Sequence, residues 1–225
     1  IVPPQPSLCS LVSPDPACRQ MMGLSLRNVT LTLLKDGKPL FTEQGEALFT
    51  HFGISGPLVL SASTYIDDVQ RHRYIAEFDL KPALDEKTLY DRLTRDFAAL
   101  GGHSAQGALE KLLPNSMRPV AVKKWGVDPA TRAAQITREQ KMALVHLCKH
   151  WQVPISELGD LQHAVITAGG VDTKEVDPKT MQSKLCPGLY FAGEVLDVDA
   201  RTGGYNLQIA WATAQAAVRA IGNDT

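Results

Sequence analysis

The sequence lacks the features that mark membrane-spanning, secreted and nucleic-acid-binding proteins. None of its apolar runs approaches the ~20 residues that a transmembrane helix needs, and no signal peptide is recognisable among its 225 residues. Lys plus Arg (23) and Asp plus Glu (24) nearly cancel, which leaves a formal net charge of −1. A broad basic surface for nucleic acid or an anionic membrane is therefore not expected. These absences predict a cytoplasmic protein that binds neither nucleic acid nor membrane.

Cysteine is also scarce, and its spacing excludes several chemistries. The four cysteines are scattered without a CxxC pair: Cys9, Cys18, Cys148 and Cys186. Free thiols are expected, with a Cys9–Cys18 disulfide as the alternative. A disulfide reductase needs two cysteines within exchange distance, and no local pair offers this. His146 and His150 flank Cys148 at helical spacing, but Cys148 belongs to an apolar stripe and no third ligand is evident, so we expect no metal site.

The first half of the chain reads as β-structure. Apolar residues alternate with polar ones from Leu24 to Leu33, with a change of phase that indicates a bulge or bend. Asp36–Gly37 is a hairpin signal. Further strands are expected over 39–42, 46–50 and 73–80, and a short helix over 58–63. Several short strands separated by turns favour a small β-barrel.

From Pro82 to Val153 the apolar period changes to that of a helix. One helix is expected to begin near Asp85 and to stop at Gly101–Gly102, and a second spans about 105–113. Thr137 and Gln140 have capping-box spacing ahead of a third, long helix, whose stripe runs to Trp151 and which Pro154 is expected to end. β-structure returns from 161 to 169. This order indicates a helical bundle inserted into a barrel.

The most informative segment lies near the C-terminus. Residues 188–193 read as a buried strand, Glu194 follows it, and Gly203–Gly204 opens an alanine-rich helix over 207–221. An acidic residue and a helix N-terminus at one sheet edge are typical of nucleotide sites in α/β proteins. By contrast, no GxGxxG motif, the usual pyrophosphate loop, occurs anywhere in the sequence.

Three segments carry a resemblance to a known family: LFTHFGISGP (48–57), AVITAGGVDTKEVDPKTMQSK (164–184) and GLYFAGEVLDVDARTGGYN (188–206). They resemble the FAD-dependent flavoproteins of the aminoacetone-oxidase and bile-acid-reductase type. The resemblance implies a multidomain α+β fold, in which a glutathione-reductase-like FAD-binding α/β domain carries a small β-barrel with an inserted helical bundle. Because the GxGxxG motif is missing, we expect a C-terminal fragment that lacks the N-terminal half of its FAD domain. The expected segments are a linker (1–22), a barrel part (23–81), the inserted bundle (82–154), a return to barrel and FAD domain (155–185) and a C-terminal strand–helix (186–225).

The resemblance also implies the site residues. The residues expected to contact the flavin and its ribityl chain are Gly193, Glu194, Gly203, Gly204, Tyr205 and Asn206. The alternatives are that Glu194 is a surface carboxylate and that Gly203–Gly204 is a turn needed only for backbone geometry. The charged loop with Asp197, Asp199 and Arg201 has three alternative roles: its side chains orient the loop, contact the substrate or are solvated. For Gly169–Gly170 the alternatives are a β-turn and a close approach of the backbone to the cofactor. His51, near Thr50 and Ser55, is a candidate acid–base residue, although a histidine fixed at a barrel rim is the more common arrangement. No other catalytic residue is identified.

The expected function is that of an FAD-dependent oxidoreductase with a small-molecule substrate and NAD(P)H as a possible electron donor. The chain would supply the flavin–ribityl side of the FAD site and the substrate-side insert. Alone it is expected to bind FAD weakly or not at all and to be inactive. The alternative is a cofactor-free binding or interaction module.

Overall fold

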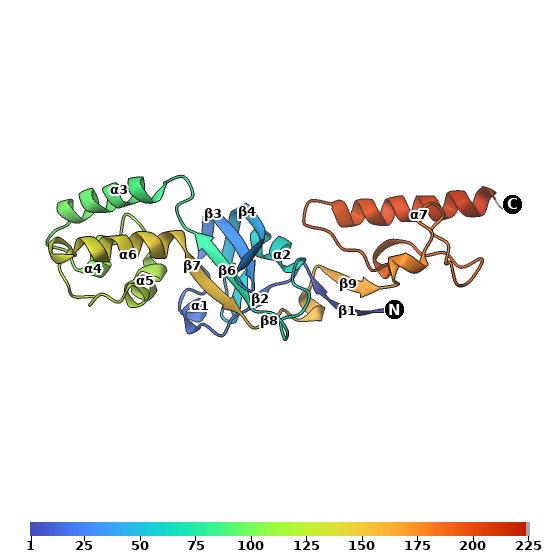
Figure 1. Cartoon of the computed structure of the whole chain (residues 1–225), viewed down its shortest axis with the longest axis horizontal. Coiled ribbons are helices and arrows are strands. Elements are labelled where there is room, and N and C mark those ends of the chain that lie inside the picture. Colours follow the sequence, from blue (N-terminus) through green and yellow to red (C-terminus); the bar gives the residue numbers. More distant parts are fainter. Residues whose placement is uncertain (224–225) are drawn as a thin grey trace. The chain divides into compact units, whose positions relative to one another are not determined.

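The computed structural model describes residues 1–223 (Figure 1), which divide into two compact units. The larger unit comprises Leu11–Leu58 and Asp68–Glu157. The smaller unit comprises Ile1–Ser10, Val59–Asp67 and the described residues from Leu158 onward. The expected division into five segments remains a prediction. The structure is nevertheless a mixed α+β fold, as the sequence indicates.

The central feature of the larger unit is an antiparallel sheet in the order β7-β6-β3-β4-β5-β2-β8. Its strands are β2 (Leu11–Val12), β3 (Ser25–Lys35), β4 (Lys38–Phe49), β5 (Gly53–Ser55), β6 (Tyr74–Asp79), β7 (Trp151–Ile155) and β8 (Glu157–Leu158). The two edge strands, β7 and β8, are separated along the chain by Ser156 alone. The Ser156 N–H donates to the Val12 carbonyl at 3.0 Å. The sheet therefore curls until its edges approach, although the ladder of the described strands does not close into the expected barrel.

The hairpin and the bulge of β3 are confirmed. β3 and β4 turn at Asp36–Gly37, where both residues have positive φ (51° and 79°), as a tight hairpin turn requires. The pairing register shifts between Leu26 and Val29, and Asn28 in the bulge has φ 56°. The expected separate strands over 39–42 and 46–50 are one continuous strand, because the intervening residues keep pairing with β3.

Four α-helices, α3 (Glu86–Ala99), α4 (Ala105–Ala108), α5 (Arg118–Trp125) and α6 (Arg138–Lys149), lie together in the larger unit (Figure 1). Asp85 caps α3, and Leu89, Leu93 and Phe97 are buried as expected. The expected helix over 105–113 was too long: only α4 forms, and turns follow it. α5 was not predicted, because its buried run Val120–Ala121–Val122 has no helical period. Gly126, in the left-handed region, ends it.

The end of α6 corrects another prediction. The capping box is confirmed, since Gln140 N–H donates to Thr137 Oγ1 at 3.2 Å and Thr137 N–H to Gln140 Oε1 at 2.9 Å. The helix ends at Lys149, however, and Trp151 begins β7, opposite Phe78 of β6. Pro154 lies within β7 instead of ending the helix. An edge strand accommodates proline, which has no N–H to donate.

Charged contacts fix two helices of the larger unit. Lys149 Nζ lies 2.5 Å from Asp79 Oδ2 and also donates to the carbonyls of Lys81 and Leu84, which ties α6 to the end of β6. Helix α1 (Pro16–Gln20) is capped by Asp15, whose carboxylate accepts the Ala17 N–H and pairs with Lys124 of α5 at 2.7 Å.

Asp15→Asn is expected to lower the stability of the fold by about 1–2 kcal/mol at neutral pH, because it keeps the helix cap but loses the charge that pairs with Lys124. Burial alone would raise the pKa of Asp15, but hydrogen bonds from Lys124 and the Ala17 N–H outweigh it, and the net pKa is lowered. A lowered folded-state pKa contributes stability that is fully present above the unfolded value, about 3.9, and that is lost as pH falls through the lowered folded-state pKa. Urea unfolding at pH 7 and pH 3 should show the parent and the variant converging in acid. An equal difference at both pH values would contradict the ion pair.

The smaller unit is built on a two-stranded antiparallel sheet, β1 (Val2–Ser7) with β9 (Ile166–Gly170). It also contains most of α2 (Pro57–Ser63), the long helix α7 (Tyr205–Asn223) and the 3₁₀ turns η3 (Leu161–His163), η4 (Thr173–Glu175) and η5 (Gly193–Val195). Its core cluster consists of Val171, Val176, Met181, Leu196 and Ala217. Residues 1–22 contain β1, β2 and α1, and their expected role as a linker remains a prediction.

The strand expected over 188–193 is absent from the described structure. Tyr190 forms one isolated bridge with Gln182, and Gly193 already begins η5. A strand needs a neighbour to satisfy its N–H and C=O groups, and residues 1–223 place no strand beside this segment. No helix within 1–223 combines the length and the apolar character that crossing a membrane requires.

Candidate functional site

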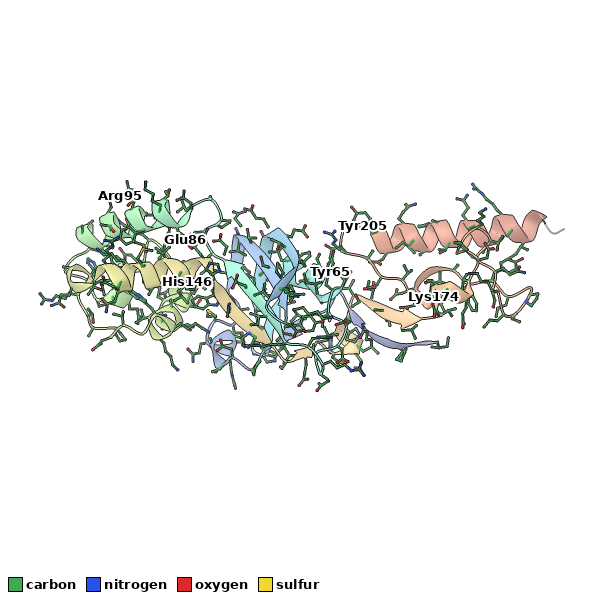
Figure 2. All side chains as sticks on the ribbon, viewed as in Figure 1. Tyr65, Glu86, Arg95, His146, Lys174 and Tyr205 are labelled. Carbon is green, nitrogen blue, oxygen red and sulfur yellow. The ribbon has the colours of Figure 1, made fainter. Side chains whose placement is uncertain are left out.

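The smaller unit contains a cavity of about 460 Å³ that gathers five of the six predicted cofactor-binding residues. These are Gly193, Glu194, Gly203, Gly204 and Asn206. Tyr205 does not line the cavity: it begins α7 (Figure 2), its side chain is 62% exposed, and its ring lies beside Gly203. The structure thus brings together residues from η5, the following loop and the start of α7. Their role in binding a cofactor remains a prediction.

Glu194 already has one partner within the unit. Its Oε1 accepts the Thr167 N–H of β9 at 2.7 Å, and the side chain is otherwise exposed. The neighbouring Gly193 N–H donates to Thr213 Oγ1 of α7 at 2.9 Å. Glu194 therefore fixes η5 against β9, and a carboxylate has further acceptor sites for a ligand hydroxyl. Thr213 was missed from the sequence, because a lone threonine in an alanine-rich helix gives no signal.

The loop from Asp197 to Asn206 is held by side-chain hydrogen bonds. Asp197 Oδ1 accepts the Gly169 N–H at 3.0 Å, and Asp199 Oδ2 accepts the Ser7 hydroxyl at 2.5 Å. The Asn206 amide bonds to both the N–H and the carbonyl of Ala200. Of the alternatives left open for Asp197 and Asp199, the structure supports loop orientation.

Gly169 and Gly170 lie at the end of β9, so the β-turn that was one of the two alternatives for them does not form. Both have positive φ, and a Cβ would come within 2.4 Å of the Pro3 carbonyl at Gly169 and of the Val195 carbonyl at Gly170. These glycines are therefore explained by close backbone packing between β9, β1 and η5.

The glycine pair at the start of α7 exposes backbone to the cavity. Gly203 and Gly204 have φ 115° and 89°, and a Cβ on Gly204 would meet no atom within 4 Å. The first N–H groups of a helix have no intrahelical partner, and the helix dipole makes this end attractive to negative charge. The arrangement can therefore accept a polar, electron-rich ring edge.

The remaining cavity wall is largely apolar, with Leu8, Val165, Ile166, Val198 and Ile209 among its lining residues. Arg201 adds a cation at the cavity, and its guanidinium lies 5.9 Å from the centre of the Tyr65 ring. Cofactor sites are typically 300–1,000 Å³, mostly apolar, with a few placed polar groups. These residues fit a flat aromatic ring with a polar edge, such as a flavin.

The acid–base candidate lies elsewhere. His51 is exposed in the turn between β4 and β5 of the larger unit, with its ring 4.9 Å from that of Phe52. Thr50 Oγ1 accepts the Gly53 N–H, and Ser55 ends β5. The local structure gives His51 an edge contact with an aromatic ring and no carboxylate, so its catalytic role remains a prediction.

The described residues contain no group that could hold a metal ion, and two of the cysteines are buried thiols with raised pKa values. Within 1–223, no group of three or more His, Cys, Asp and Glu side chains is placed to hold a metal ion. His146 lies on α6 (Figure 2), and its ring contacts that of His150 at 4.6 Å. All four cysteines are free, so the Cys9–Cys18 disulfide does not form. Burial raises the pKa of Cys148 to about 12 and that of Cys18 to about 11, which keeps both thiols protonated.

The curled sheet with its helical group and the cavity beside a glycine-opened helix belong to a mixed α+β protein. Residues 5–166 match the family described as "HI0933-like protein barrel and H2TH domain". The chain belongs to this family.

Three curated relatives extend the comparison. The chain is 33% identical over 223 residues to a ribosomal RNA dihydrouridine synthase of Haemophilus influenzae, covering 98% of this chain and 52% of that protein. It is 30% identical over 216 residues to the Escherichia coli protein of the same name, covering 96% and 52%. It is 30% identical over 183 residues to a 3-dehydro-bile acid delta(4,6)-reductase of Clostridium scindens, covering 80% and 45%. The chain thus spans about half the length of the curated relatives it matches.

Proposed function

We propose that this chain is part of a longer FAD-dependent reductase that saturates a carbon–carbon double bond next to a carbonyl group. Forming dihydrouridine saturates the C5–C6 bond of uracil, and a delta(4,6)-reductase acts on double bonds of a steroid. Both reactions add a hydride and a proton to a conjugated bond, with NAD(P)H as the proposed source of electrons. The single observation that carries the proposal is the match of nearly the whole chain to reductive enzymes.

The residues of the cavity have defined tasks in this proposal. A bound flavin would supply the hydride for the reduction. The apolar wall around Ile166 and Ile209 would exclude water from the ring. Glu194 would accept a hydrogen bond from a ribityl hydroxyl, and the N-terminus of α7 at Gly203–Gly204 would favour negative charge at the pyrimidine edge.

We infer that the substrate is uridine in RNA, which departs from the expectation, based on the near-neutral net charge, that the chain binds no nucleic acid. The two relatives named for ribosomal RNA match 98% and 96% of the chain, whereas the bile-acid reductase matches 80%. A small molecule, the substrate class expected from the sequence, remains the second candidate, because the bile-acid reductase is still 30% identical.

The whole protein should be yellow when purified and should convert uridine to dihydrouridine in ribosomal RNA when supplied with NAD(P)H. Nucleoside mass spectrometry of the digested RNA measures the product. A 3-oxo steroid with conjugated double bonds, supplied in parallel, should be left unchanged. Reduction of the steroid without reduction of RNA would favour the second candidate. Protein without flavin would contradict the reductase and favour a cofactor-free interaction module.

A further inference from the structure

Although the whole chain is nearly neutral, basic residues concentrate in the helical part of the larger unit. Between Ala105 and Lys149 the sequence has eight Lys and Arg against three Asp and Glu, a net charge of +5, so the rest of the chain carries −6. Lys124 and Lys149 are paired with Asp15 and Asp79. The net charge of −1 therefore conceals a basic region, and such a region is the electrostatic signature of a phosphate-binding surface.

A small cavity of about 90 Å³ in the same unit has two basic residues in its wall. It is lined by Arg27 of β3, by Lys81, which follows β6, and by Leu113, Pro114 and Met117 from the segment before α5. Arg27 lies in the β3 bulge, next to Asn28 with φ 56°. Bulges re-aim side chains, and Arg27 of this bulge lines the cavity.

Two further guanidinium groups flank the same segment. Arg118 Nε donates to the Leu113 carbonyl at 3.0 Å, and Arg92 Nη2 donates to the Lys111 carbonyl at 2.7 Å. Within 1–223, neither Arg27 nor Lys81 has a hydrogen-bond or ion-pair partner for its side-chain cation. The carboxylates of Asp96 and Asp79 are paired with other cations, Arg92 and Lys149 respectively. Burial, and then repulsion from Arg92, lower the pKa of Lys81, as expected for a cation without a compensating anion.

We propose that Arg27 and Lys81 form a binding site for backbone phosphates of the RNA substrate. The proposal rests on the proposed function, because it assigns the surface that holds that RNA. A phosphate would supply the negative charge that the cavity lacks, and arginine can bind it through two parallel hydrogen bonds. An extended polyanion fits better than a free phosphate ion, because the same helical segment has further exposed basic residues: Lys111, Lys123, Arg132 and Arg138.

The test measures binding of the whole protein to a fluorescently labelled ribosomal RNA fragment over a range of salt concentrations. The variants are Arg27→Gln, Lys81→Gln and the double variant, and the control is Lys38→Gln. Lys38 is exposed, begins β4 and pairs with Lys35 at the hairpin end of β3, roughly 26 Å along the strand direction from Arg27. Circular dichroism and FAD content verify folding, and the exposed Arg27 remains informative if Lys81→Gln fails to fold.

Each lost phosphate contact lowers the slope of log affinity against log salt by about 0.7–0.9. The double variant should therefore lose about 1.5 units of slope and on the order of tenfold in affinity at low salt, while Lys38→Gln matches the parent. If the parent binds and reduces RNA but the double variant keeps the parental slope and affinity, the site is wrong and the proposed function stands. If the variants bind inorganic phosphate more weakly but bind RNA as tightly as the parent, the site is also wrong. If the parent neither binds nor reduces RNA, the proposed function fails.

Discussion

Replacing Glu194 by alanine is expected to weaken FAD binding by the whole protein by roughly 10- to 100-fold, because a hydrogen bond to a charged group contributes about 1.5–3 kcal/mol. Glu194 lines the cavity together with Gly193, Gly203, Gly204 and Asn206. Fluorescence titration of the flavin-free protein with FAD measures the affinity. An unchanged affinity in Glu194→Ala would contradict the assignment of this carboxylate to the cofactor.

A second variant separates the cofactor contact from the structural one. Glu194 Oε1 also accepts the Thr167 N–H of β9, so alanine removes a structural hydrogen bond as well. Glu194→Gln keeps an acceptor oxygen for Thr167 but removes the charge, and we expect a smaller loss of FAD affinity from it. Glu175→Ala, on η4 of the same unit and outside the cavity lining, is the matched control and should bind FAD like the parent.

Replacing Trp151 by alanine is expected to cost about 3–5 kcal/mol of stability, the usual range for truncating a large buried aromatic side chain. Trp151 is 1% exposed, lies opposite Phe78 in the sheet, and has Lys124 Nζ 5.5 Å from the centre of its ring. For a chain of this length the melting temperature should fall by roughly 10 °C. Thermal unfolding followed by circular dichroism measures the effect.

Two control variants sharpen this result. The Trp151 indole N–H has no hydrogen-bond partner among the described residues, so Trp151→Phe keeps a buried ring without losing a hydrogen bond and should cost much less than alanine. Gln152→Ala, at the exposed neighbouring position of β7, loses only an exposed hydrogen bond to Glu77 and should cost at most about 1 kcal/mol. A small loss in Trp151→Ala would instead indicate that this residue does not lie in the core of the larger unit.

Trp151 also shows where sequence patterns fail. Helical spacing relates four residues here: Leu144, Leu147, Cys148 and Trp151. The helix nevertheless ends at Lys149, because Trp151 is buried in the sheet, where it pairs with Phe78 of β6. Similarly, Val120–Ala121–Val122 has no period because α5 is buried on more than one side. Residues 188–193 have the composition of a buried strand, and only tertiary pairing decides whether a strand forms. These outcomes depend on contacts that are distant in the sequence.

Local signals, by contrast, were reliable. The Asp36–Gly37 hairpin, the bulge before Val29 and the Thr137–Gln140 capping box are each fixed by residues that are close in the sequence, and all are confirmed. The candidate site shows the same division. The motif from Gly193 to Asn206 could be found by its composition, but Ile166 and Leu8 line the same cavity only because β1 pairs with β9. The cavity at Arg27 and Lys81 likewise forms only on folding, because these residues are distant in the sequence. The net charge of −1 gave no indication of the basic segment near it.

Hydrogen exchange of the whole protein with and without FAD tests the central claim most directly, since it reports where the cofactor contacts this chain. The account predicts slower exchange of backbone N–H groups in a peptide covering 193–206 when FAD is bound, because Gly203, Gly204 and the start of α7 face the cofactor. Exchange at the Asp36–Gly37 hairpin should stay unchanged. FAD binding with no added protection at 193–206 would show that the flavin lies elsewhere and would contradict the account.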